Sequence, residues 1–388
     1  MTLPPFQTVS TGAVVAIVGF FSSFPIVLQG LTGVGASPQQ AAAGLMAAAL
    51  AMALAGAVLS MAYRMPISAA WSTPGVALLA VTAPVEGGFA VAVGGFLLAG
   101  VLTVVAGFWR PLARFAADIP APLAQAMLAG VLVSLCIAPF EALAEAPRAA
   151  LPIILTWFLV GRVNKLFAVP AAVVAAGGVT FLWGDLSILS ESAVLTAPLF
   201  ILPEFTFQGA ISIGLPLFVV TMAAQNIPGI AVLRSFGYTP SPGGQIAGVG
   251  IVSVLGAPFG APQTCLAAIT AAMCAGDDAC ADAARRYWAA VMAALFYAVF
   301  GLFAALITAL AAAAPPMVLE TLAGIALMGV FANSAQAALH EVSSREAAAV
   351  TFLITASGAS VAGIGAPVWG LAVGGLVYMC TARARRGA

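Results

Sequence analysis

Two amides and two hydroxyls lie in otherwise apolar stretches of the sequence, each pair just before a proline. Gln225 and Asn226 open the run QNIPGI, and Ser22 and Ser23 open the run SSFPIV. An amide pair inside an apolar segment is costly unless another polar group or a ligand pairs with it. We therefore expect these side chains to bind a small molecule by hydrogen bonds. An amide cannot titrate, so Gln225 and Asn226 cannot carry a proton. The two serines can instead bond back to their own helix.

Proline-rich runs mark a second pair of candidate segments. PISAAWSTPG occupies positions 66–75 and GAPFGAP occupies positions 256–262, followed by Gln263 and Thr264. Proline removes a backbone donor and interrupts a helix, so each run predicts an extended segment followed by a half-helix. We expect Ser72 and Thr73, and likewise Gln263 and Thr264, at or just before the half-helix N-termini. Two such N-termini facing each other would bind an anion without any Lys or Arg.

Aromatic side chains near these segments favour a ligand with a flat apolar body. Phe24, Trp71 and Phe259 are the candidates, although Trp71 can also serve in packing or as an interfacial anchor. The pocket chemistry suits a small anion with an aromatic or apolar part. The predicted substrate-binding residues are Ser22, Ser23, Phe24, Trp71, Ser72, Thr73, Gln225, Asn226, Gln263 and Thr264.

The composition shows what kind of chain must position these residues. Of 388 residues, 13 are basic and 13 acidic, so 7% are charged, while 63% are hydrophobic. A soluble domain typically carries about 25% charged residues. This composition excludes a soluble enzyme, a disordered chain and a nucleic-acid-binding protein, and the unbroken apolar runs disfavour a transmembrane barrel. We expect an all-α polytopic membrane protein.

Hydropathy and prolines divide the chain into about fourteen expected spans. They lie near 12–31, 40–62, 66–84, 88–108, 121–139, 149–161, 166–184, 209–230, 244–257, 261–275, 286–310, 316–337, 346–358 and 360–380. With this count, every basic residue except Arg148 falls on the side of the two termini. Basic residues gather on the cytoplasmic side of membrane proteins, so both termini are expected in the cytoplasm.

The paired motifs indicate an internal duplication. The Ser22 and Gln225 runs fall in spans 1 and 8, and the two proline-rich runs fall in spans 3 and 10. A unit of seven spans must insert its second copy upside down, which gives the inverted repeat common among secondary transporters. We expect the first repeat at 1–195 and the second at 205–388.

No motif for ATP, a cofactor, a metal or a nucleophilic enzyme occurs in the chain, so we expect neither an enzyme nor a cofactor. Transport would then be driven by an ion gradient or by the gradient of the substrate. A channel-like anion pathway is an alternative function for a chain of this kind.

The runs PISAAWSTPG, QNIPGIAVLRSFGY and GAPFGAP resemble those of the BenE family of bacterial benzoate:proton symporters, over essentially the whole chain. The family is similar in fold to the nucleobase transporters of the uracil–xanthine type and to the sulfate/anion transporters. The resemblance implies a core domain at 10–110 and 207–312 and a gate domain at 118–195 and 315–381. It also implies import of benzoate with a proton across the cytoplasmic (inner) membrane. Transporters of this fold are often dimers, so a homodimer is expected by analogy.

One departure from the pattern concerns the proton. Relatives of the uracil type carry glutamates at the span 8 and span 10 positions, whereas this chain has Gln225, Asn226 and Gln263 there. A fixed carboxylate would repel benzoate, so the neutral side chains suit an anionic substrate. The proton could cross on the substrate, because burial in an apolar pocket favours the protonated carboxyl group. A nucleobase or an inorganic anion is the alternative substrate.

Overall fold

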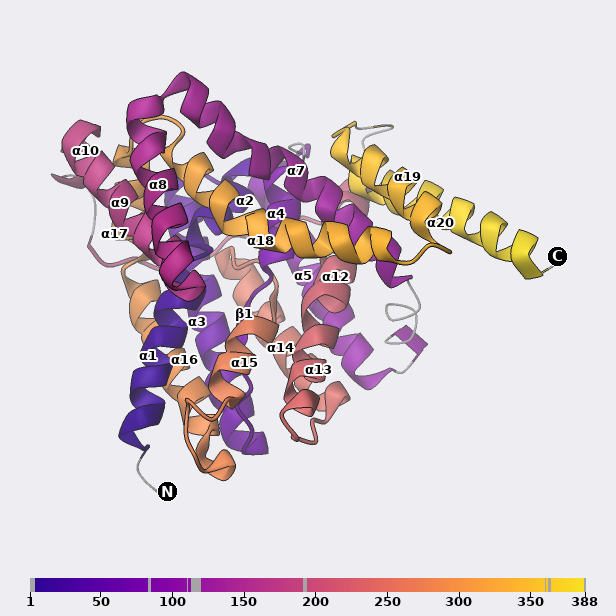
Figure 1. Cartoon of the computed structure of the whole chain (residues 1–388), viewed down its shortest axis with the longest axis horizontal. Helices are drawn as coiled ribbons and strands as arrows, with labels where there is room; N and C mark the ends of the chain where they lie inside the picture. The colour runs from indigo at the N-terminus through magenta and orange to yellow at the C-terminus, as the bar shows by residue number, and fades with distance from the viewer. Residues whose placement is uncertain are drawn as a thin grey trace.

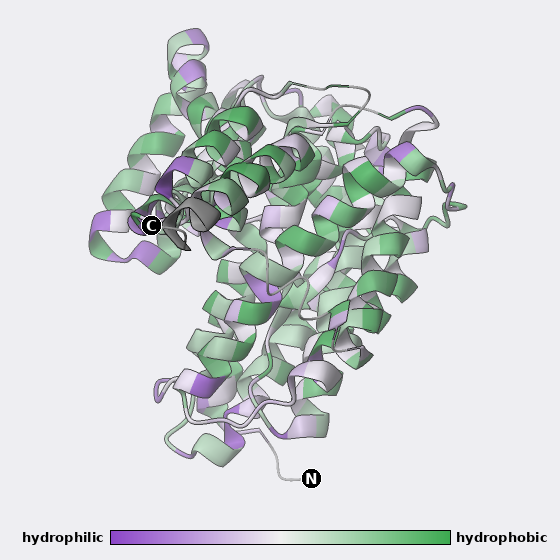
Figure 2. Cartoon of the chain, turned by 90° about the vertical axis from the view of Figure 1, so that its right-hand side faces the viewer, coloured by the Kyte–Doolittle hydropathy of each residue, from purple (hydrophilic) through white to green (hydrophobic). Residues whose placement is uncertain are grey.

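The computed structural model describes residues 4–82, 85–109, 111–112, 120–190, 194–359, 361 and 364–386. It is a helical protein in which one group of helices packs across another (Figure 1). Figure 2 shows hydrophobic residues along the helices, with hydrophilic residues mainly in loops and at helix ends. The expectation of an all-α membrane protein is confirmed.

The first helix group combines an early and a late part of the chain. Its members are α1 (Phe6–Phe21), α2 (Phe24–Gly33), α3 (Pro38–Tyr63), α4 (Thr73–Ala80), α5 (Gly88–Phe108), α11 (Phe207–Gly209), α12 (Leu215–Thr221), α13 (Ile227–Ser235), α14 (Pro242–Gly256), α15 (Ala268–Ala275), α16 (Tyr287–Leu302) and α17 (Ala304–Ala313). Two π-helices, η2 (Ala210–Gly214) and η3 (Met222–Asn226), and two 3-10 turns, η4 (Ala257–Phe259) and η5 (Ala283–Arg285), complete it. Within this group α3 packs on α16, α5 on α14 and α2 on α4.

The second helix group comes from the middle and the end of the chain. It consists of α7 (Ala121–Glu145), α8 (Pro147–Val163), the turn η1 (Lys165–Phe167), α9 (Ala168–Trp183), α18 (Val318–His340), α19 (Arg345–Ala356) and α20 (Ala366–Arg386). Here α7 packs along α18 and α19, and α19 packs along α20. The short helix α10 (Ser187–Ser190) contacts α17 of the first group.

Two local features stabilise the first group: a side-chain cap at the start of α3 and small residues where helices approach closely. Ser37 caps α3 in a reciprocal pair with Gln40, which satisfies two end donors. At Gly12 of α1, an added Cβ would lie 2.8 Å from the backbone nitrogen of Ala293 on α16. Only glycine permits this approach, as is typical of helix pairs in membranes.

Eight helices of the described chain are long and apolar enough to cross a membrane, or nine with the α16–α17 pair, which bends by 57°. The expected count of fourteen spans stays a prediction, because several of the expected spans are short or broken here. Residues Phe6–Gly33 form one of these spans, with a local break: α1 ends at Phe21 and α2 begins at Phe24, so the break falls on Ser22 and Ser23.

The two helix groups coincide in sequence with the expected core and gate domains, but that division and the cytoplasmic termini stay predictions. Arg110 and Arg114, which contributed to the orientation argument, lie outside the described residues.

Candidate functional site

Spans 3 and 10 meet at the centre of the first helix group through a pair of short strands. β1 (Ala69–Trp71) and β2 (Thr264–Leu266) pair antiparallel, with Ala70 opposite Cys265. α4 follows β1 and α15 follows β2, so each strand leads into a half-helix. The prediction of two extended segments followed by half-helices is therefore confirmed. The pairing satisfies backbone groups that would otherwise be unpaired inside the membrane.

The N-terminus of α4 is closed by side chains of the protein. Ser72 is its N-cap, as expected, and the Ser72 hydroxyl accepts from the N–H of Gly75 at 3.1 Å. The Thr221 hydroxyl donates to the same Ser72 oxygen at 2.7 Å. Pro74 has no N–H. Among the described residues, Thr73 thus carries the one first-turn N–H of α4 without an acceptor.

The N-terminus of α15 is open by contrast. Its N-cap is Ala267, which has no side chain to accept a hydrogen bond. Within the described chain, the N–H groups of Ala268, Ile269 and Thr270 have no acceptor. Ile269 is 68% exposed, so this end of the helix is accessible. Free N–H groups and the positive end of the helix dipole make it a place where an anion can bind.

Gln263 and Thr264 do not lie at this N-terminus, so that part of the expectation is wrong. Thr264 opens β2 and Gln263 precedes it, because the residues after Pro262 extend to pair with β1 and the helix begins only at Ala268. The Gln263 amide donates to Thr103 Oγ1 and to the carbonyl of Ala99 on α5.

Ser253 of α14 supports the second strand. Its hydroxyl accepts from the N–H of Thr264 at 2.9 Å and lies 3.2 Å from the Thr264 carbonyl. Gln263 Oε1 and Thr264 Oγ1 are buried and have no hydrogen-bond partner among the described residues. Both oxygens thus remain able to bind a further polar group.

The break between α1 and α2 joins this centre. The Trp71 indole N–H donates to Ser23 Oγ at 2.9 Å, and Ser23 donates in turn to the carbonyl of Gly19 at 3.0 Å. Ser23 therefore bonds both to its own helix and to β1. Phe20 lies edge-on to the Trp71 ring at 5.3 Å, so Trp71 is a buried packing residue. Ser22, next to Ser23, is half-buried.

The amide pair of span 8 lies in the π-helix η3, a local feature that often marks functional sites. Asn226 is fully buried, and its Oδ1 accepts from the N–H of Leu266 in β2 at 2.9 Å. Asn226 Nδ2 lies 3.3 Å from the Met222 sulfur. Gln225 is half-buried. Asn226 thus holds the strand in place, while Gln225 is the better placed of the two to reach a ligand.

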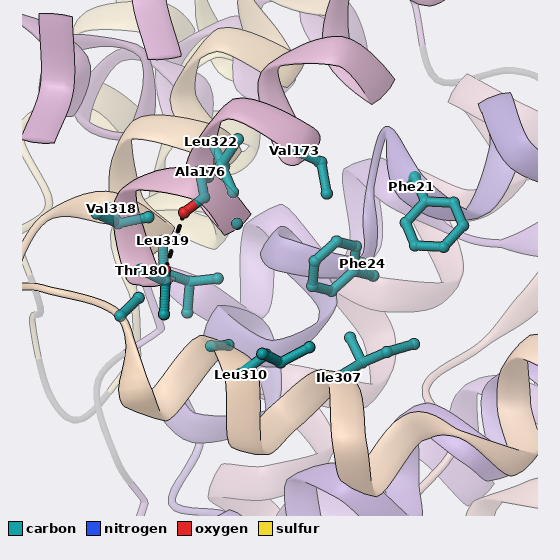
Figure 3. A pocket seen from close by; sticks show the side chains of 13 residues that line it. Phe21, Phe24, Val173, Ala176, Thr180, Ile307, Leu310, Val318, Leu319 and Leu322 are labelled. Carbon is teal, nitrogen blue, oxygen red and sulfur yellow. Dashed lines mark hydrogen bonds between the residues drawn. The ribbon is translucent and has the colours of Figure 1, made fainter. Parts of the chain in front are cut away.

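An apolar cavity of about 140 Å³ lies between the two helix groups, beside the α1–α2 break (Figure 3). Phe21 and Phe24 form one wall, and residues of α9, α17 and α18 form the others. The Thr180 hydroxyl in the lining already donates to the carbonyl of Ala176. The cavity suits an aromatic ring but offers a carboxylate no free donor. Phe24 is thus placed as expected, whereas Phe259 pairs with Phe200 and lines a different groove, formed by α3 and α14.

Contacts across long stretches of sequence supply several residues that the sequence motifs did not reveal. Thr221 pairs with Ser72 across 149 positions, and the Ser68 hydroxyl donates to Thr270 at 2.8 Å. Thr103 and Ser253 likewise support β2 and its flank. No local spacing marks Thr221, Ser68 and Thr103, because their partners come from the other half of the chain. Ser253 lies only 11 positions from its partner Thr264. The described groups of this centre are neutral, and its possible ligand contacts are backbone N–H groups and amides.

Two solved structures share this fold. The transmembrane domain of the cyanobacterial bicarbonate transporter BicA matches with a TM-score of 0.60 and 19% identity, over 95% of this chain and 97% of that one. The murine anion transporter Slc26a9, in its inward-facing state, matches with a TM-score of 0.66 and 13% identity, over 100% of this chain and 69% of that one. The chain thus has the inverted-repeat fold of helical membrane transporters.

Sequence comparison gives the family. The profile of BenE, described as benzoate membrane transport protein, matches residues 4–380. The chain is 36% identical to the inner membrane protein YdcO of Escherichia coli (strain K12), over 97% of this chain and 96% of that protein. It is 28% identical to the benzoate membrane transport protein of Acinetobacter baylyi, over 95% and 93%. The chain belongs to the BenE family, whose members are membrane transporters and not enzymes, and the resemblance seen in its motifs is confirmed.

Proposed function

We propose that this protein is a secondary transporter that imports benzoate or a similar aromatic carboxylate, together with a proton, across the bacterial inner membrane. Both termini lie in the cytoplasm. The family and the names of the two relatives support the substrate class and the membrane. Within the molecule, the open N-terminus of α15 carries the proposal, because it offers three free N–H groups to a carboxylate.

The substrate contacts follow from the chemistry of the site. The carboxylate accepts from the first-turn N–H groups of α15, and Gln225 adds a side-chain donor. The aromatic ring packs on apolar walls such as Phe24. Thr270, in the first turn of α15, lies close to the end of α1, because a Cβ added at Gly19 would be 3.4 Å from the Thr270 methyl group. The start of α15, which would bind the carboxylate, is therefore near the helix break that carries Phe24. A neutral pocket of this kind binds an anion without the desolvation cost of a buried basic residue.

Alternating access uses the two helix groups. The first group is the core, which carries the site, and the second is the gate. Contacts between them are few and local, as where α2 meets α18 and α4 meets α7. Movement of the core along the gate would expose the substrate to one side of the membrane and then the other.

Labelled benzoate uptake into proteoliposomes tests the proposal, with and without an inward proton gradient. We expect saturable uptake that the gradient stimulates. Empty liposomes are the essential control, because neutral benzoic acid crosses lipid unaided. Uptake no faster than in empty liposomes would reject benzoate as the substrate, and fluxes that do not saturate and show no counter-flow would indicate a channel-like pathway.

An inorganic anion is the second candidate, because the solved neighbours are described as bicarbonate and anion transporters. Competition of labelled benzoate with unlabelled bicarbonate, sulfate and uracil separates the possibilities. We expect benzoate to be displaced by aromatic carboxylates and not by these three compounds.

A further inference from the structure

A cleft with a partly polar lining lies between the two helix groups, and it is bordered by other residues of α2 than the apolar cavity. One part, of about 450 Å³, is lined by Gln29 and Thr32 of α2, the end of α4, α7 and Glu320 of α18. An adjoining part of about 480 Å³ shares Ser134 and the end of α4 with it and extends to α19 and α20. The first turn of α18 thus has two faces, because Leu319 faces the apolar cavity in Figure 3 whereas Glu320 faces the cleft.

Glu320 is the only titratable residue among the described residues that line this cleft. It is exposed, and it forms no ion pair or hydrogen bond with another described residue. The rest of the lining is made of hydroxyls, one amide and apolar groups. Glu320 therefore sets the charge of the cleft.

Charged residues on the neighbouring helices lie elsewhere. α2, α4 and α9 carry none. On α7, Glu141 is exposed outside the cleft lining, and Glu145 lines a separate recess with Arg148 of α8. Arg162 of α8 stacks on Phe158 near the other end of that helix. Arg345 and Glu346 of α19 lie at the opposite end from the cleft lining, as does His340 of α18.

The cleft lies close to the substrate site. It is bordered by Ala80 at the end of α4, and Ser72 at the other end of this helix belongs to the centre described above. The eight residues of α4 span about 12 Å, so the cleft and the centre lie at opposite ends of one short helix. Two negative charges in a cleft walled by protein repel each other more than they do in bulk water. An aromatic carboxylate that approaches through the cleft therefore meets the charge of Glu320.

We propose that Glu320 makes access of the anion to the site depend on protons. In its ionised form, Glu320 repels the carboxylate in the cleft. When a proton from water binds to the Glu320 carboxylate, the cleft becomes neutral and the anion passes to the site. This inference rests on the proposed function, and it adds a proton-binding group on the protein to the proton that the substrate itself can carry.

The experiment measures the half-saturation concentration for exchange of labelled benzoate, with the same pH inside and outside the proteoliposomes. Concentrations are expressed as the benzoate anion, and empty liposomes are subtracted. For the wild-type protein we expect this concentration to fall at least about threefold as the pH is lowered and Glu320 gains a proton. For Glu320→Gln we expect a flat profile that stays at the low, acidic value. Unchanged wild-type pH dependence in Glu320→Gln would overturn the inference.

Two variants and one ligand complete the test. Glu320→Asp keeps the carboxyl group and should keep the pH dependence, even if Glu320→Gln were to fold poorly; a flat profile in Glu320→Asp would also overturn the inference. Glu141→Gln removes a charge outside the cleft and should behave as wild type. Benzenesulfonate, used as an inhibitor, stays ionised throughout the pH range, so any pH dependence of its inhibition constant comes from the protein. This constant should fall with pH in the wild-type protein as the half-saturation concentration does, and its pH dependence should disappear in Glu320→Gln. If the wild-type protein does not exchange benzoate at all, the proposed function fails, independently of the Glu320 variants.

Discussion

The two strand–half-helix junctions occupy equivalent places in the two halves of the chain, yet their hydrogen bonding differs. At the β1–α4 junction, Ser72 caps the half-helix and Thr221 bonds to the cap. At the β2–α15 junction, Ala267 occupies the N-cap and leaves the first-turn N–H groups free. The strands of the two junctions, β1 and β2, pair with each other in an antiparallel register.

This difference would allow an inverted repeat to form a single anion-binding site. The backbone course is kept in both copies, because each extended segment needs the other to satisfy its peptide groups inside the membrane. The side chains are under no such constraint. One N-terminus is closed and stabilises the structure, and the other is open and can bind an anion.

The sharpest way to test this asymmetry is to remove one N–H from each junction without disturbing the helix. Proline fits the first helical position and removes only the N–H. We expect Ala268→Pro to weaken benzoate binding by roughly 10- to 150-fold, because a hydrogen bond to a charged group contributes about 1.5–3 kcal/mol. The dissociation constant is measured on purified protein by isothermal titration.

Thr73→Pro is the matched control, since Thr73 is the first residue of α4. It should change the dissociation constant by less than about threefold, because α4 is capped by the protein itself. Equal losses in both variants would show that the two N-termini bind the substrate together, as the symmetry of the sequence had predicted.

The next largest effect concerns the support of β2. Asn226→Ala removes the acceptor of the Leu266 N–H, and a buried donor left without a partner costs about 1–3 kcal/mol. We expect a lower melting temperature in detergent as well as weaker binding. Gln225→Ala should weaken binding by several-fold and leave the melting temperature unchanged, because Gln225 is half-buried. If Gln225→Ala destabilised the protein as much as Asn226→Ala, the assignment of Gln225 as the ligand-facing amide would be wrong.

The sequence predicted the elements well where proline and polar residues occur together within a few positions. The extended segments of spans 3 and 10 and the role of Ser72 as an N-cap follow from PISAAWSTPG and GAPFGAP, since proline acts on the backbone of its own neighbourhood. The same runs resemble the BenE family, and that resemblance predicted the fold of the whole chain.

Contacts between the halves could not be predicted in this way. Gln263 looked equivalent to Ser72, but its amide donates to Thr103 on α5, and the start of α15 is set by how far β2 pairs with β1. Glu320 lies within the expected apolar span at 316–337, where no neighbouring motif marks it. Its position in a cleft depends on how α18 packs against α2 and α7, which no local pattern encodes.

The smallest effect is expected at the closed junction, and it tests the comparison from the other side. Ser72→Ala removes the acceptor of the Gly75 N–H and the partner of the Thr221 hydroxyl, and loss of such a cap costs about 1 kcal/mol. We expect a small decrease in melting temperature. Thr221→Val keeps the cap and should lower the melting temperature less. Because Ser72→Ala also frees one N–H, α4 then becomes more similar to α15. Benzoate affinity that stays the same would indicate that the anion binds at α15 alone, whereas a clear loss of affinity would make Ser72 part of the binding site and reject the view that one junction is structural and the other functional.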